Sequence, residues 1–205
     1  MRKLIHIPSI HKPIEGLGIS DPQDKELARK VFEENRSMLE DFDADFSRVR
    51  VYLDNVADGE QLYTQMRILN GSKQSYENFL AGILVSQGAT IEATEDATVI
   101  SEARDAYEAW KESIRNGIAY DAESFNALLD TMIERRDESI AKKISGSLRD
   151  GEIGVLIIGV AHKAHLMLEP DIEVITQNSE LIKELESRTA EGVAHFRQRG
   201  AEKTG

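Results

Sequence analysis

Two kinds of segment alternate along the 205-residue chain. Short runs of apolar, often β-branched residues predict five strands. These strands are expected at residues 3–10, 49–53, 88–96, 154–159 and 172–175. Longer segments with apolar residues every third or fourth position predict helices at residues 22–42, 60–87, 99–115 and 179–197, and a longest helix that begins at residue 121 or 124 and ends at 148. Alternating strands and helices indicate an α/β fold with a mostly parallel central sheet covered by helices, together with a helical insertion.

The helical segment at residues 60–87 is interrupted at Asn70-Gly71-Ser72, a sequence typical of a turn. Before this break Leu62, Met66 and Leu69 recur at helical spacing, which predicts that they face the core. The chain length suits one domain, expected at residues 1–198, with a disordered tail at 199–205.

Charge and composition narrow the classes of partner. The chain has 37 acidic and 25 basic residues and a formal net charge of −12, which repels nucleic acid and anionic membranes. It contains no cysteine, which excludes disulfides, thiol catalysis and iron–sulfur clusters. Neither a secretory signal nor an apolar run of membrane-spanning length is evident, so we expect a soluble, cytoplasmic protein without nucleic-acid or membrane partners.

Polar, titratable residues follow four of the predicted strands. His11, Asp54, Glu95 and His162 each come at or just after a strand end. Because the carboxyl ends of parallel strands meet at one edge of a sheet, these side chains are expected to lie close together. Two histidines and two carboxylates are suited to a general acid/base set. They also suit a divalent-metal site, with His11, Glu95 and His162 as the expected ligands.

Arg136 lies in a run of charged residues, 134–138, midway along the longest predicted helix. Such a run is typical of a solvated helix face with salt bridges. Alternatively, Arg136 points into the crevice, where it holds an anionic group of the substrate or stabilises a developing oxyanion.

The stretch from Arg136 to His162 resembles the C-terminal signature of one superfamily. Its members include the TraB/PrgY pheromone-shutdown proteins, the Tiki proteases, the ChaN-type haem-binding proteins and the erythromycin esterases. The signature is an Arg, an Asn or Asp, two further residues and an apolar-Ala pair, followed by a strand and Gly-x-x-His. Here it reads Arg136-Asp137-Glu138-Ser139-Ile140-Ala141, then Gly159-Val160-Ala161-His162.

The resemblance implies an α/β enzyme of this hydrolase-like superfamily, in which Arg136 and His162 are site residues. It also implies that Glu95 corresponds to the central glutamate of the family and His11 to its first histidine. The chain departs from the family pattern at Pro8, where relatives have Gly, and at Asp54, where they often have Glu.

The leading hypothesis is therefore a hydrolase that cleaves an ester or amide bond of a small molecule or peptide, with a divalent metal ion as its candidate cofactor. Its catalytic residues would be His11, Asp54, Glu95, Arg136 and His162. The alternative is a non-catalytic protein that binds a metal, haem or a small anion with the same residues. A third interpretation is a structural partner that forms a homo-oligomer through the long helix at residues 121–148.

Overall fold

The chain folds around a five-stranded sheet whose strands all run parallel. The computed structural model describes residues 1–9, 22–71, 75–116 and 122–202. Within these residues the strands are β1 (Arg2–Ser9), β2 (Val49–Leu53), β3 (Thr90–Glu92), β4 (Ile153–Gly159) and β5 (Ile172–Thr176), in the order β3-β2-β4-β1-β5. The predicted α/β fold with a parallel sheet is confirmed.

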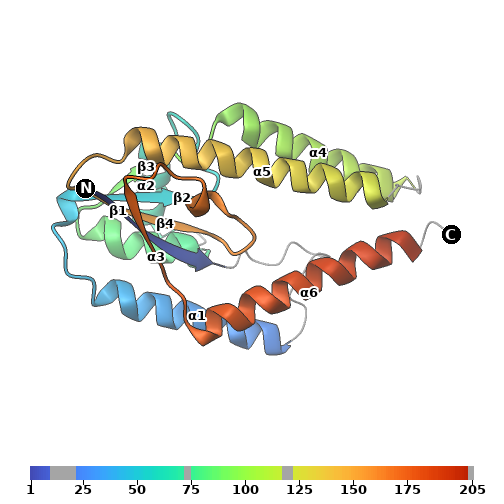
Figure 1. The fold of residues 1–205 in the computed structure, drawn as a ribbon, viewed down its shortest axis with the longest axis horizontal. Helices are drawn as coiled ribbons and strands as arrows, with labels where there is room; N and C mark the ends of the chain where they lie inside the picture. Colours follow the sequence, from blue (N-terminus) through green and yellow to red (C-terminus); the bar gives the residue numbers. More distant parts are fainter. Residues whose placement is uncertain (10–21, 72–74, 117–121, 203–205) are drawn as a thin grey trace.

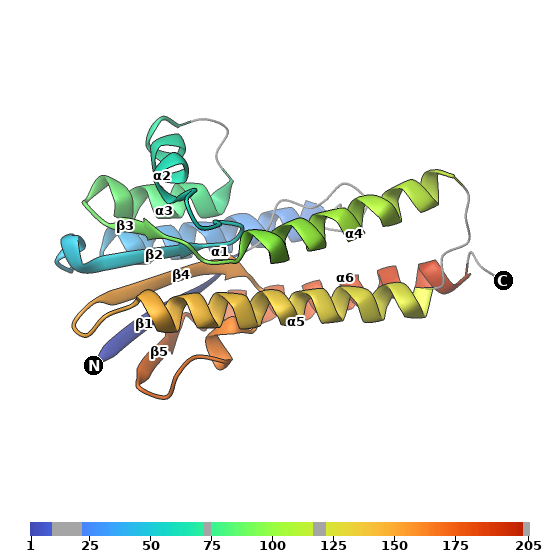
Figure 2. The ribbon, with the colours of Figure 1, turned by 90° about the horizontal axis from the view of Figure 1, so that it is seen from above.

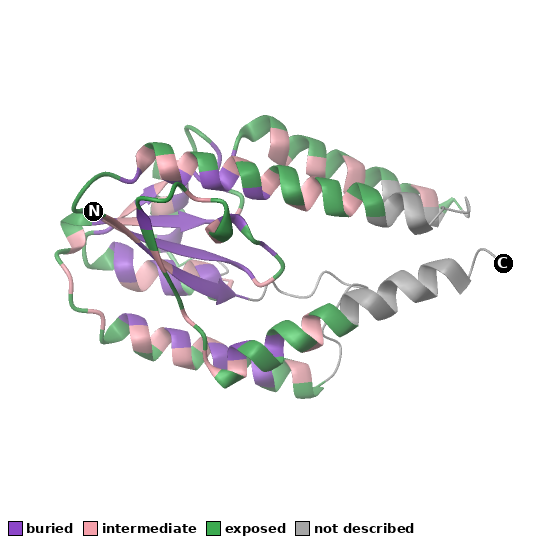
Figure 3. Ribbon diagram, in the orientation of Figure 1, coloured by how far each residue is buried: buried purple, intermediate pink, exposed green. Residues whose placement is uncertain are grey.

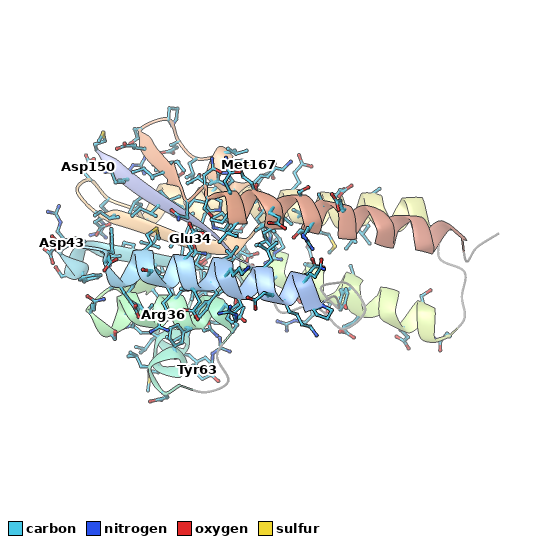
Figure 4. The ribbon with its side chains drawn as sticks, turned by 90° about the horizontal axis from the view of Figure 1, so that it is seen from below. Glu34, Arg36, Asp43, Tyr63, Asp150 and Met167 are labelled. Atoms are coloured by element: carbon cyan, nitrogen blue, oxygen red, sulfur yellow. The ribbon has the colours of Figure 1, made fainter. Side chains whose placement is uncertain are left out.

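Helices cover both faces of the sheet (Figures 1 and 2). They are α1 (Pro22–Glu40), α2 (Gln61–Leu69), α3 (Tyr76–Ser86), α4 (Ala97–Arg115), α5 (Ala122–Ser147) and α6 (Glu180–Glu202), with 3-10 turns η1 (Phe46–Arg48) and η2 (Ala164–Leu166). α1 and α3 lie against one face, α5 lies against the other, and α6 runs beside α1 (Figure 4). In the described part of the chain, no helix combines the length and hydropathy needed to cross a membrane.

β4 is buried on both faces, as its continuous apolar run predicts (Figure 3). Val155 and Ile157 pack with the residues of α3 in one core cluster. Leu156 and Ile158 point the other way and pack with Ile140 of α5. The sheet therefore separates two apolar cores. The carboxyl ends of its strands point to the side of the molecule where α5 begins and α6 ends (Figure 1).

Three sequence-based expectations differ from the structure. β3 spans only Thr90–Glu92, because the N–H groups of Thr94 and Glu95 leave the ladder and donate to the carbonyl of Val56. The predicted core residues of α2 are exposed, while Thr64 and Ile68 on its other side are buried. The part of the predicted tail at residues 199–202 belongs to α6.

Gly154 allows α5 to end close to the sheet. A Cβ atom at this position would lie 2.5 Å from Cδ1 of Leu4 and 3.3 Å from both Leu148 and Tyr52. These three neighbours are buried core side chains, so they have little room to move. Gly146, in the last turn of α5, has no neighbouring atom within 4 Å of a Cβ added in the same way.

We therefore expect Gly154→Ala and Gly146→Ala to change stability in opposite directions. Gly154→Ala should lower the free energy of unfolding by about 1–3 kcal/mol, because it overpacks the core. Gly146→Ala should raise it by about 0.4–1 kcal/mol, because alanine fits the backbone and the open space at this position and has less conformational freedom than glycine in the unfolded chain. Urea denaturation of both variants measures the difference, and equal effects would contradict the close packing at Gly154.

Candidate active site

Arg136 on α5 lies between two buried carboxylates at the ends of neighbouring strands. Its Nε and Nη2 atoms donate to Oε2 and Oε1 of Glu95 at 2.7 and 2.9 Å. Nη2 also donates to the carboxylate of Asp54, which directly follows β2. A paired, two-pronged contact of this kind is the arrangement that a planar guanidinium makes best. Of the two interpretations of Arg136, the structure favours the one in which its side chain points inward.

The chain after β2 and the chain after β3 are tied together so that both carboxylates face Arg136. Asn55 adopts a left-handed backbone conformation, with φ of 62°, which asparagine tolerates better than most residues. This turn directs the N–H of Asn55 to Oε1 of Glu95 at 2.8 Å. On the following residue, the carbonyl of Val56 accepts the N–H groups of Thr94 and Glu95 at 2.8 and 3.1 Å.

His162 is held by Asp137, the residue after Arg136 on α5. Nδ1 of His162 lies 2.6 Å from Oδ1 of Asp137, and both side chains are buried. The other oxygen of Asp137 accepts the N–H of Lys163 at 2.7 Å. The N–H of His162 also closes a turn onto the carbonyl of Gly159, the last residue of β4. The carboxylate thus fixes both the ring and the backbone of this turn.

Asp54 links the histidine to the arginine. Its Oδ1 pairs with Arg136, and its Oδ2 lies 3.9 Å from Nε2 of His162. With the ring nitrogen Nδ1 directed at Asp137, the Nε2 side of the ring faces Asp54. The structure therefore brings together Asp54, Glu95, Arg136 and His162, four of the five predicted site residues. The fifth, His11, lies outside the described residues.

Burial and ion pairing act in opposite directions on the charges of this cluster. Burial raises the pKa of Glu95, and its contacts with Arg136 oppose that shift. Burial disfavours the charge of Arg136, but the hydrogen bonds to Glu95 and the charge of Asp54 raise its pKa overall. The guanidinium is therefore permanently charged, and its charge is compensated inside the protein.

The described side chains do not fit a divalent cation. In the described ranges of the chain, no group of three or more His, Asp and Glu residues is arranged to hold a metal ion. Both oxygens of Glu95 accept hydrogen bonds from Arg136 and Asn55, and a cation beside them would meet the charge of Arg136. The predicted metal site depends on His11 and stays a prediction.

Sequence reasoning from strand ends overlooked Asp137. Its position in a charged helical run gave no sign that it is buried, yet it follows Arg136 in the signature that the chain resembles. The same reasoning also overlooked Ser9 at the end of β1, whose hydroxyl donates to Oε1 of Glu77 at 2.8 Å. A single strand-end serine is too common in sequences to predict such a pair.

Two further histidines, His6 on β1 and His165 on η2, form a pair outside this cluster. Their rings stack with centroids 3.9 Å apart. Both nitrogens of His6 and Nδ1 of His165 are buried, and none of these atoms has a hydrogen-bond partner among the described residues. Burial, with a smaller contribution from His165, lowers the pKa of His6 to about 3. Burial also lowers the pKa of His165, while the charge of Asp137 acts against that shift.

No family model, curated protein or solved structure matches the chain. The resemblance to the superfamily therefore stays a prediction that rests on the residues quoted above.

The ion pairs of Arg136 predict a large loss of stability when this side chain is removed. Arg136→Met leaves Asp54 and Glu95 buried without their counter-charge, which should lower the free energy of unfolding by about 3–5 kcal/mol. Arg135→Met is the matched control, because Arg135 pairs with Glu102 at the surface and its loss should cost less than about 1 kcal/mol. Denaturant unfolding at neutral pH measures both. Equal losses would contradict a structural role for the buried pairs.

The histidine stack predicts a loss of stability in acid. In the unfolded chain His6 binds a proton below its ordinary pKa of about 6.5, whereas in the folded chain it does so only near pH 3. Stability should therefore fall as the pH drops from about 6.5 toward 3, by about 1.4 kcal/mol per pH unit for this one group. His6→Leu should remove that slope.

The measurement is the difference in unfolding free energy between wild type and His6→Leu from pH 8 to pH 4.5. The difference should be constant above pH 7 and should shift in favour of the variant below pH 6. Curves that stay parallel over the whole range would show that His6 is readily protonated in the folded protein.

Proposed function

We propose that this protein hydrolyses an ester or amide bond, with His162 as the general base and acid. The observation that carries the proposal is the buried Asp137–His162 pair, placed at the carboxyl end of β4 beside Asp54 and Arg136. Parallel α/β sheets bind their ligands at this edge. A histidine oriented by a buried carboxylate is also the arrangement that acid/base catalysis requires.

Asp137 would fix the tautomer of the imidazole. By accepting a hydrogen bond from a protonated Nδ1, it leaves Nε2 as the basic nitrogen and stabilises the imidazolium that forms when Nε2 takes up a proton. The second contact of Asp137, with the N–H of Lys163, prevents the carboxylate from turning away. Asp137 is in this scheme a positioning residue.

The reaction would proceed in two proton transfers. Nε2 of His162 removes a proton from a water molecule as the water oxygen attacks the carbonyl carbon of the substrate. The tetrahedral intermediate then collapses, and the bond to the leaving oxygen or nitrogen breaks as Nε2 returns the proton to it. Arg136, held rigid by Glu95 and Asp54, would stabilise the negative charge on the carbonyl oxygen.

The superfamily suggested by the sequence supports the same reaction class, because it includes esterases and proteases. A dependence on a divalent metal remains part of the proposal only through His11. Elemental analysis of the purified protein and of His11→Ala tests that part separately.

Hydrolysis of a panel of p-nitrophenyl esters and aminoacyl p-nitroanilides tests the function. We expect His162→Gln to lower kcat by about 10²–10⁴-fold with little change in KM, because it removes proton transfer and leaves substrate contacts in place. Asp137→Asn should lower kcat strongly as well, since it favours the wrong tautomer.

His165→Gln is the matched control, three residues along the same loop and outside the hydrogen-bond network of His162. It should retain turnover. Circular dichroism and thermal unfolding show whether each variant is folded. Full activity in folded His162→Gln would refute the proposed role of this histidine, and absence of hydrolysis across the panel in the wild type would argue against the reaction class.

A further inference from the structure

α2 exposes four of its five large apolar side chains to solvent, and of these five only Ile68 is buried against the protein. Leu62 and Tyr63 are each 70% exposed, and Met66 and Leu69 are each 55% exposed. On the inner side Thr64 is buried, and the side chain of Gln65 accepts the N–H of Ile91 at 3.4 Å. A surface helix normally has the reverse orientation. Figure 2 shows α2 standing out from the body of the molecule, and Figure 4 shows Tyr63 at its outer edge.

We propose that this outward face of α2, made of Leu62, Tyr63, Met66 and Leu69, is the contact surface of a homodimer. The proposal is independent of the hydrolase function. It assigns self-association to α2, whereas the sequence had suggested the long helix that became α5.

The exposed area is what a stable dimer needs. If a large side chain carries roughly 200 Å² of surface, the four side chains expose on the order of 500 Å² of mainly apolar area. A standard interface buries about 800 Å² on each partner, of which about 56–65% is apolar. The face of α2 therefore supplies the apolar part of one half of such an interface.

The charges beside this face are self-complementary. Glu60 and Arg67 are both exposed, and their spacing of seven residues places them on the same side of α2, about two turns apart. When two α2 helices pair antiparallel about a twofold axis, Glu60 of each copy meets Arg67 of the other. The same pairing places Leu62 against Met66 of the second copy. An anionic membrane is a poorer occupant, because the chain carries a net charge of −12.

Sedimentation equilibrium over a range of protein concentrations tests the proposal. The wild type should be a dimer in equilibrium with monomer, and Met66→Glu should raise the dissociation constant by about tenfold or more. Leu166→Glu is the matched control, because Leu166 is 71% exposed on η2, away from α2. It should leave the dissociation constant unchanged.

Exchanging the charges of Glu60 and Arg67 tests whether the two α2 helices pair antiparallel. Glu60→Arg and Arg67→Glu should each weaken the dimer, and the double variant should restore it, since the exchanged charges face one another again. A monomeric wild type at every concentration, or a dimer that Met66→Glu does not weaken, would overturn the proposal. Binding of a monomeric wild type to phosphatidylcholine vesicles, lost in Met66→Glu, would overturn it in favour of a lipid surface.

Discussion

The buried guanidinium of Arg136 is the constraint on which the arrangement of the site depends. A charge in a medium of low dielectric must have fixed partners, and here those partners are the carboxylates that follow β2 and β3. Successive residues on a helix point about 100° apart, so the next residue, Asp137, reaches in another direction to the loop after β4. One turn of α5 thus positions the ends of three strands relative to one another.

Local sequence patterns predict the elements of this fold well, because periodicity reflects burial. The apolar run at residues 154–159 predicts β4 as a doubly covered strand, and polar residues at the strand ends predict an edge rich in titratable groups. The pairing of Arg136 with Asp54 and Glu95 spans 82 and 41 residues of sequence, so no local pattern contains it. The early end of β3 is likewise absent from any local pattern, since it follows from hydrogen bonds to Val56 on the neighbouring loop.

α2 shows where helical periodicity misleads. The spacing of Leu62, Met66 and Leu69 correctly predicts a helix with these three residues on one side, but it carries no information about which way that side faces. The orientation is set by the neighbours: Ile68 packs beside Gly82 of α3, and Gln65 bonds to β3. An apolar stripe at helical spacing therefore predicts the helix, but it does not predict whether the stripe faces the core of the same chain.

The charge balance of the site bears on what it can bind. Asp54 and Glu95 bring two carboxylates to one guanidinium, and both already share the hydrogen-bond donors of Arg136. An anionic substrate group would have to compete with these carboxylates at close range, so the structure gives little support to Arg136 as an anion clamp. A charge that is held rigid and compensated in the ground state is better suited to an oxygen that becomes negative only during the reaction, because the donor geometry is already fixed when that charge appears. The uncharged carbonyl of an ester or amide meets this condition.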